Sequence, residues 1–122
     1  MAHLYMGMEY LRTNNLKTSL LSLQQAKHIC PSDPLVHNEI GVIYYKQKNY
    51  AEAKNFYTQA LDMSENATSW IVETILSNLA HCYRKLKDYK NSIKHLEKCV
   101  TLKPQNGNTY FSLAFAYYLS NN

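Results

Sequence analysis

Apolar residues recur three and four positions apart along nearly the whole chain, a spacing that places them on one face of an α-helix. In the stretch 34–47 they are Ile40, Val42, Ile43 and Tyr44, and in 50–63 they are Ala53, Phe56, Tyr57, Ala60 and Leu61. The pattern predicts helices over 3–14, 16–29, 34–47, 50–63, 69–86, 89–102 and 107–120. The chain is therefore expected to be all-α, with about seven helices.

Polar and conformationally restricted residues mark the ends of these helices. Asp33 is an expected helix cap, and Pro34 suits the first helical position because its fixed φ is already helical. Asn49 interrupts the apolar pattern between two predicted helices. The chain contains only 3 Gly and 3 Pro, too few for the turns of an all-β sandwich or barrel.

A repeat of about 34 residues underlies the pattern. A small residue followed three positions later by tyrosine occurs four times, as Gly7 with Tyr10, Gly41 with Tyr44, Ala80 with Tyr83 and Ala114 with Tyr117. The spacings between these pairs are 34, 39 and 34 residues, and a second small residue (Ala26, Ala60 or Cys99) follows 19 positions after each of the first three. Self-similarity at such a period is typical of helical repeat proteins. Because the four tyrosines recur at one position, they are expected to pack between helices.

One repeat consists of two amphipathic helices and a tight turn, and the small residues Gly41 and Ala53 would let the two helices of a pair approach closely. Each pair leaves an apolar face uncovered, so it must stack on its neighbours. We therefore expect an α-solenoid with repeats at 1–33, 34–72 and 73–106 and a lone first helix at 107–120. The extra residues near 64–68 are expected to form a longer loop and an N-terminal extension of the fifth helix, with Trp70 packing there.

The last predicted helix is unusually apolar for the end of a solenoid, which normally has a polar cap. Phe111, Phe115, Tyr117 and Tyr118 lie on it with no second helix to cover them. We therefore expect the chain to be a piece of a longer array that self-associates through this helix.

Composition excludes several classes of function. The net charge is +4, from 13 Lys+Arg against 9 Asp+Glu, which is too mild for a nucleic-acid binder. No apolar run approaches the ~20 residues that a membrane span needs. We thus expect no nucleic-acid partner and no membrane association.

Candidate chemistry is sparse. The 3 cysteines, Cys30, Cys82 and Cys99, form no CxxC or CxxH pair, so neither a disulfide framework nor a metal site is expected. The glycines are too dispersed for a phosphate-binding loop. His81 and Cys82 are adjacent on one helix and point ~100° apart, so they form no nucleophile–base pair. We expect a protein without enzyme activity or cofactor.

The landmarks of the repeat resemble the tetratricopeptide repeat (TPR) signature, W-x2-L-G-x2-Y…A-x3-F…A…P. The second copy reads Ile40-Gly41-x2-Tyr44, then Ala53-x3-Tyr57, then Ala60. The departures are His37 at the usual tryptophan position, Ser19 and Ser92 for alanine, and Glu65 for proline. The resemblance implies a right-handed superhelix of helix-turn-helix repeats that binds other proteins.

A narrower resemblance is to the cell-division-cycle sixteen family of TPR subunits of the anaphase-promoting complex. It rests on LYMGMEYLRTNN, PSDPLVHNEIGVIYY, LSNLAHCYRKLKDY and LKPQNGNTYFSLAFAY, and on the element Asn78-Leu79-Ala80-His81-x2-Arg84-Lys85-Leu86. The resemblance implies a scaffold of a cell-cycle ubiquitin ligase, located in the nucleus and cytoplasm. It also implies as partners neighbouring TPR subunits and a small accessory subunit, whose N-terminal segment lies inside the superhelix.

The TPR resemblance implies that the first helix of each pair lines the concave face. With Gly41 at position 8 of its repeat, the inward positions give a candidate peptide-binding groove. Its residues are Asn38, Glu39, Val42, Tyr45, Asn78, His81, Arg84, Phe111 and Phe115. Two alternatives stay open: cations at helix C-termini complement the helix dipole, and the two phenylalanines could pack against a further helix.

The alternative function is that of a generic TPR adaptor or a co-chaperone-like peptide-binding module outside the ubiquitin system. A co-chaperone module would need a clamp of lysine, asparagine and arginine at set groove positions. Only Asn78 matches that pattern, because Asn38, Val42, Asn108 and Ser112 stand at the others. Binding of a free acidic C-terminus is therefore disfavoured.

Overall fold

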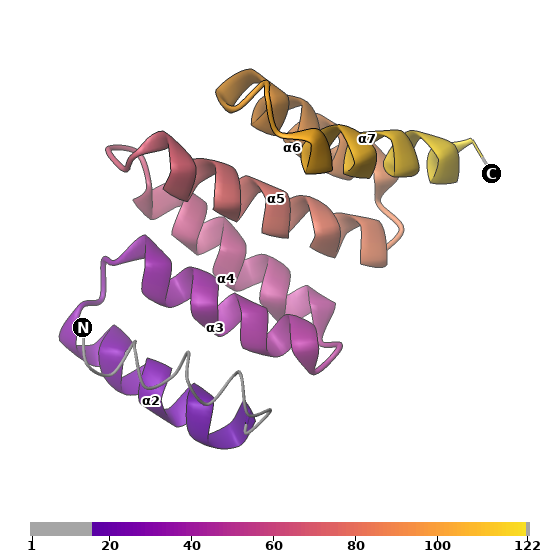
Figure 1. Cartoon of the computed structure of the whole chain (residues 1–122). Helices are drawn as coiled ribbons and strands as arrows, with labels where there is room; N and C mark the ends of the chain where they lie inside the picture. Colours follow the sequence, from indigo (N-terminus) through magenta and orange to yellow (C-terminus); the bar gives the residue numbers. More distant parts are fainter. Residues whose placement is uncertain (1–15, 122) are drawn as a thin grey trace.

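The computed structural model describes residues 16–121, which form six helices (Figure 1). They are α2 (Leu16–Ile29), α3 (Pro34–Lys46), α4 (Tyr50–Met63), α5 (Ser69–Lys85), α6 (Tyr89–Leu102) and α7 (Gly107–Ser120). Six predicted helices are thus confirmed, with ends correct to within one residue. The helix expected over 3–14 lies outside the described residues.

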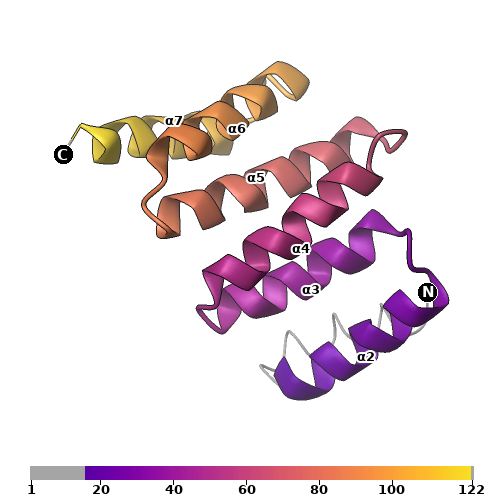
Figure 2. The same ribbon diagram turned by 180° about the vertical axis from the view of Figure 1, so that it is seen from behind.

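The helices stack in chain order. Each packs against the next, and α3 also contacts α5 across the helix between them. α4 and α6 lie behind α3, α5 and α7 in Figure 1 and in front of them in Figure 2. The expected α-solenoid is therefore confirmed, with the first helices of successive pairs on one side and the second helices on the other.

Side-chain caps explain where most helices begin. Oδ1 of Asp33 accepts a hydrogen bond from the Leu35 amide at 3.0 Å, and Pro34 opens α3. Asn49 and Asp88 cap α4 and α6 in the same way, so both satisfy a free amide of the first helical turn. Thr68 precedes α5 but makes no side-chain cap bond.

The turn inside each pair repeats in detail. Lys48 (φ 62°) and Lys87 (φ 65°) occupy the left-handed region 39 positions apart. The residue after each donates its amide to a tyrosine carbonyl, Asn49 to Tyr44 at 2.9 Å and Asp88 to Tyr83 at 2.8 Å. The repeat therefore extends from side-chain pattern to backbone conformation.

The core runs between the helices as three linked clusters centred on Ile40, Leu79 and Leu96. Small residues set the helix spacing, since Ala53, Ala60 and Ala80 have no exposed surface. Gly41 faces the ring of Tyr57 on α4, and a Cβ there would lie 2.6 Å from Tyr57 Cε1. The close approach at Gly41 is thus confirmed, but the nearest group is the Tyr57 ring and not the small Ala53.

Two packing expectations were wrong. Trp70 is 54% exposed instead of packed beside the 64–68 loop, because it lies in an extra first turn of α5 that has no counterpart in α3 or α7. Tyr117 is 46% exposed, whereas the equivalent Tyr44 stacks on Phe56 of its own second helix at 5.3 Å. No helix follows α7 within residues 16–121 to play the part of α4.

No helix among the described residues is both long and apolar enough to span a bilayer.

Candidate functional site

Two asparagines connect the first helices α3 and α5. Nδ2 of Asn78 donates to Oδ1 of Asn38 at 3.0 Å. Asn38 is only 2% exposed, whereas Asn78 is half-buried. Asn38 therefore holds the amide of Asn78 in one orientation and offers almost no surface of its own, although it was predicted to line the groove.

A second link joins α5 to α7 through a cation and an aromatic ring. The Arg84 guanidinium carbon lies 5.2 Å from the centroid of Phe115, within the range of a cation–π interaction. Burial raises the pKa of Tyr45, and the charge of Arg84 partly opposes that rise, so Arg84 also neighbours α3. Arg84 thus lies near one aromatic side chain of α3, Tyr45, and one of α7, Phe115. This face of the three first helices is called the α3–α5–α7 wall.

Glu39 and Val42 complete the α3 side of this surface. Burial raises the pKa of Glu39, while a hydrogen bond with the Asn38 side chain and the charge of Lys46 work against the rise. Val42 is half-buried and packs against the core clusters on both sides of α3. The α3 part of the wall thus combines the partly buried carboxylate of Glu39 with the apolar side chain of Val42.

His81 lies on α5 between Asn78 and Arg84. Burial lowers its pKa, and the neighbouring charges of Arg84 and Lys85 lower it further. The imidazole is therefore neutral near pH 7, with one ring nitrogen that donates and one that accepts. Together with Asn78, it offers both kinds of hydrogen-bonding group that an extended peptide backbone requires.

The α7 end of the site is strongly apolar. Phe111 is 77%, Tyr118 65% and Phe115 41% exposed. Large exposed aromatic patches of this kind mark contact surfaces. Phe115 lies beside Arg84, and Phe111 and Tyr118 share its face of α7 at helical spacing, so these rings lie on the same side of the solenoid as Arg84.

Sequence reasoning missed one residue of this face. Trp70 stands four positions before Thr74 and eleven before His81, so it shares their stripe on α5. The signal was present in that spacing, but Trp70 was assigned to packing beside the 64–68 loop and not to this face. Its exposed indole adds an aromatic surface at the N-terminal end of the stripe.

The described residues offer little for catalysis. Burial raises the pKa of the Cys82 and Cys99 thiols to about 12, so neither supplies a thiolate near neutral pH. No cluster of His, Cys, Asp and Glu side chains that could hold a metal ion lies within residues 16–121.

The histidine environment predicts a pH dependence of stability. Burial lowers the pKa of both His81 and His95, so the unfolded chain takes up protons first as the pH falls. The free energy of unfolding should be greatest above about pH 7 and should decrease as the pH falls through about 6.5. Urea denaturation at a series of pH values measures it.

The control is the double variant His81→Gln/His95→Gln, which removes both groups. Its stability should change less between neutral and mildly acidic pH than that of the parent chain. An identical pH dependence in the two proteins would contradict the assignment.

Comparison with known families identifies the repeats. Models of the tetratricopeptide repeat match residues 34–67 and 74–106, which together cover α3–α4 and most of α5–α6. These two matches span more than half of the chain.

Similar proteins extend the match over nearly the whole sequence. Anaphase-promoting complex subunit 6 of Arabidopsis thaliana is 42% identical, over 98% of this chain and 22% of its own length. The human cell division cycle protein 16 homolog is 32% identical, over 98% of this chain and 20% of its own length. The chain thus spans about a fifth of these relatives.

A solved structure agrees with this similarity. A chain in the crystal structure of the APC/C hetero-tetramer Cut9-Hcn1 superposes with a TM-score of 0.89 at 26% identity. The match covers 98% of this chain and 23% of that one.

Proposed function

Because the chain belongs to the tetratricopeptide repeat family and resembles the Cdc16 subunits, we propose that it is a protein-binding segment of an anaphase-promoting complex scaffold. The proposal rests on similarity over 98% of the chain to subunit 6 of that complex and to the human Cdc16 homolog. The scaffold would serve the cell cycle by holding other subunits and would perform no chemistry itself.

We further propose that the wall formed by α3, α5 and α7 binds the N-terminal segment of a small accessory subunit. The observation behind this proposal is the linked surface in which Asn38 orients Asn78 and Arg84 stacks on Phe115. Oriented amides pair with peptide backbone groups, and aromatic and arginine side chains usually dominate interface energies. The Cut9-Hcn1 complex provides a structural analogy.

The remaining partners are proposed on the same basis. Neighbouring TPR subunits would contact the solenoid, and the protein would work in the nucleus and cytoplasm.

Co-purification tests the proposed complex. The full-length parent protein is tagged and isolated from cell extract, and the bound proteins are identified by mass spectrometry. Recovery of other anaphase-promoting complex subunits is the expected result. Recovery of chaperones without any ubiquitin-ligase subunit would contradict the proposal and favour a co-chaperone-like module.

The exposed aromatics of α7 predict that the 122-residue chain self-associates. Phe111 and Tyr118 are the most exposed of these rings, and pairing two copies would remove them from water. Sedimentation velocity at increasing concentration should show a dimer or larger species, and Phe111→Glu/Tyr118→Glu should restore a monomer. A parent chain that stays monomeric at high concentration would contradict the prediction.

A further inference from the structure

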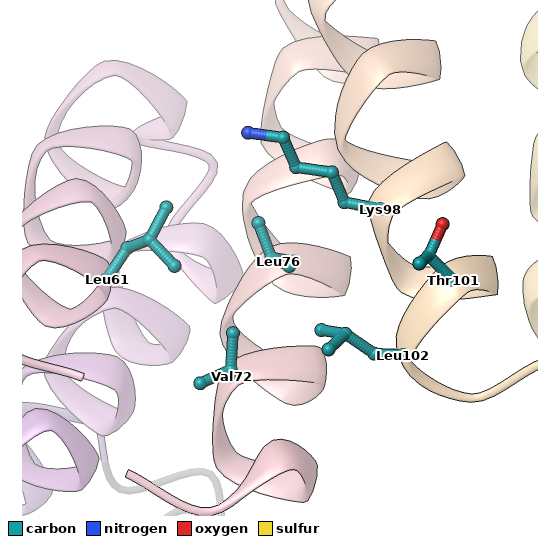
Figure 3. Close-up of a pocket in the computed structure, with 6 residues that line it drawn as sticks. All are labelled: Leu61, Val72, Leu76, Lys98, Thr101 and Leu102. Carbon is teal, nitrogen blue, oxygen red and sulfur yellow. The ribbon is translucent and has the colours of Figure 1, made fainter. Parts of the chain in front are cut away.

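An apolar cavity opens on the side of the solenoid formed by the second helices. It has a volume of about 430 Å³ and lies over the N-terminal half of α5, between α4 and α6 (Figure 3). Val72 and Leu76 form its floor, Leu61 lines it from α4, and Thr101 and Leu102 line it from α6. Leu102 is 40% exposed, so the cavity presents apolar surface to water.

The longer third repeat supplies part of this floor. Val72 belongs to the extra turn by which α5 precedes its repeat position, while α3 and α7 begin at that position. The cavity is thus a feature of this repeat, separate from the α3–α5–α7 wall.

Cations border the cavity. Lys98 extends from α6 across the cavity, with its ammonium group at the rim (Figure 3). Lys94 lies one turn before Lys98 on the same face of α6, and both lysines are exposed. Neither forms an ion pair within residues 16–121. Two exposed acidic residues also adjoin the lining in sequence, Asp62 beside Leu61 on α4 and Glu97 beside Lys98 on α6. Glu97 accepts a hydrogen bond from the Tyr117 hydroxyl at 2.6 Å.

The cationic surface continues along α5 beyond the cavity. Lys54 of α4 places its Nζ 5.9 Å from the ring centroid of Tyr83, and His95 of α6 lies 5.2 Å from the same ring. Lys98 and Lys94 are both close enough to act electrostatically on that histidine. The Lys54 ammonium group therefore lies over Tyr83, two turns along α5 from Leu76. On the α6 side, Lys94 and Lys98 bring positive charge near His95, and the carboxylate of Asp88 partly opposes it.

We propose that this outer groove docks an acidic segment of a partner protein that inserts one large apolar side chain into the cavity. The seven residues from Leu76 to Tyr83 span about 10 Å of helix, which an extended chain covers in about three residues. The bound segment would thus carry a leucine or phenylalanine with carboxylates beside it and about three residues away. Unpaired lysines supply the complementary charge and the apolar cavity supplies the affinity.

Fluorescence anisotropy with the full chain tests the proposal. The probe is a fluorescein-labelled peptide of about eight residues, with a central leucine between glutamates. Lys98→Glu should weaken its binding about ten-fold, and replacing the peptide leucine with alanine should have a similar effect. The peptide change leaves the protein intact, so it remains informative even if a protein variant folds poorly.

Two matched variants locate the site. Lys17→Glu makes the same charge change on exposed α2 and should leave the affinity unchanged, as should Phe115→Ala on the opposite side. Equal losses from Lys17→Glu and Lys98→Glu would show non-specific charge attraction and overturn the proposal. The proposal would also be overturned if Phe115→Ala weakened binding of the labelled peptide, or if replacing the peptide leucine with alanine had no effect on affinity. A peptide that does not bind the parent chain would overturn it as well.

Discussion

Replacing Gly41 with leucine should lower the free energy of unfolding by about 1–3 kcal/mol, because the new side chain overpacks the α3–α4 interface. A Cβ at this position would lie 2.6 Å and 2.8 Å from Tyr57 Cε1 and Cδ1. The ring cannot move aside easily, since Tyr57 is only 2% exposed and belongs to the same core cluster as Leu79 and Cys82 of α5. Leucine is a better helix former than glycine by about 1 kcal/mol, so the net loss appears only if the clash exceeds that gain.

Gly107 provides the matched control. It also lies in a helix, but a Cβ built there meets no atom within 4 Å. Gly107→Leu should therefore leave stability unchanged or raise it slightly, whereas Gly41→Leu lowers it in the same urea titration followed by circular dichroism. Equal free energies of unfolding for Gly41→Leu and the parent chain would contradict the observed packing of α3 on α4.

Changing Asn78 and His81 together to alanine should weaken binding of the accessory-subunit peptide by about 100-fold, a loss expected when two central hydrogen-bonding side chains are removed. Both residues lie on α5, and the Asn38 bond fixes the orientation of Asn78. Isothermal titration calorimetry with the synthetic N-terminal segment of the accessory subunit gives the affinities.

The double variant needs a stability check, because Asn78→Ala also removes the partner of buried Asn38. A buried polar group left unpaired costs about 1–3 kcal/mol. His81→Ala alone leaves the Asn78–Asn38 bond intact and should still weaken binding of the peptide by about ten-fold. Lys94→Ala/Lys98→Ala, on the opposite side of the solenoid, should bind the peptide as the parent does. Normal affinity in the double variant would remove both residues from the proposed groove.

The helices and their caps could be predicted because the signals are local. Asp33 and Pro34 act within one helical turn, and the apolar spacing of 34–47 and 50–63 repeats at each turn. The small-residue and tyrosine landmarks also predicted the stacked architecture, since Gly41, Tyr44 and Tyr83 mark contacts between neighbouring helices.

The features that sequence reasoning missed depend on neighbours distant in the chain. Tyr117 was assigned to packing because Tyr44 and Tyr83 pack, but its environment depends on a helix that residues 16–121 do not supply. Asn38 and Asn78 are 40 positions apart, and no local pattern indicates that one orients the other. The outer cavity lies between α4 and α6. The alignment of the repeats does not indicate how far apart these two helices lie.

The α3–α5–α7 wall can be tested most directly by photo-crosslinking the bound accessory-subunit peptide. A photoreactive phenylalanine analogue is placed in turn along the peptide, and the crosslinked residues are identified by mass spectrometry. We predict crosslinks only on the α3–α5–α7 wall, around Asn78 and Phe115. Crosslinks that fall instead on α4 and α6 would contradict the proposal that this side of the solenoid holds the partner.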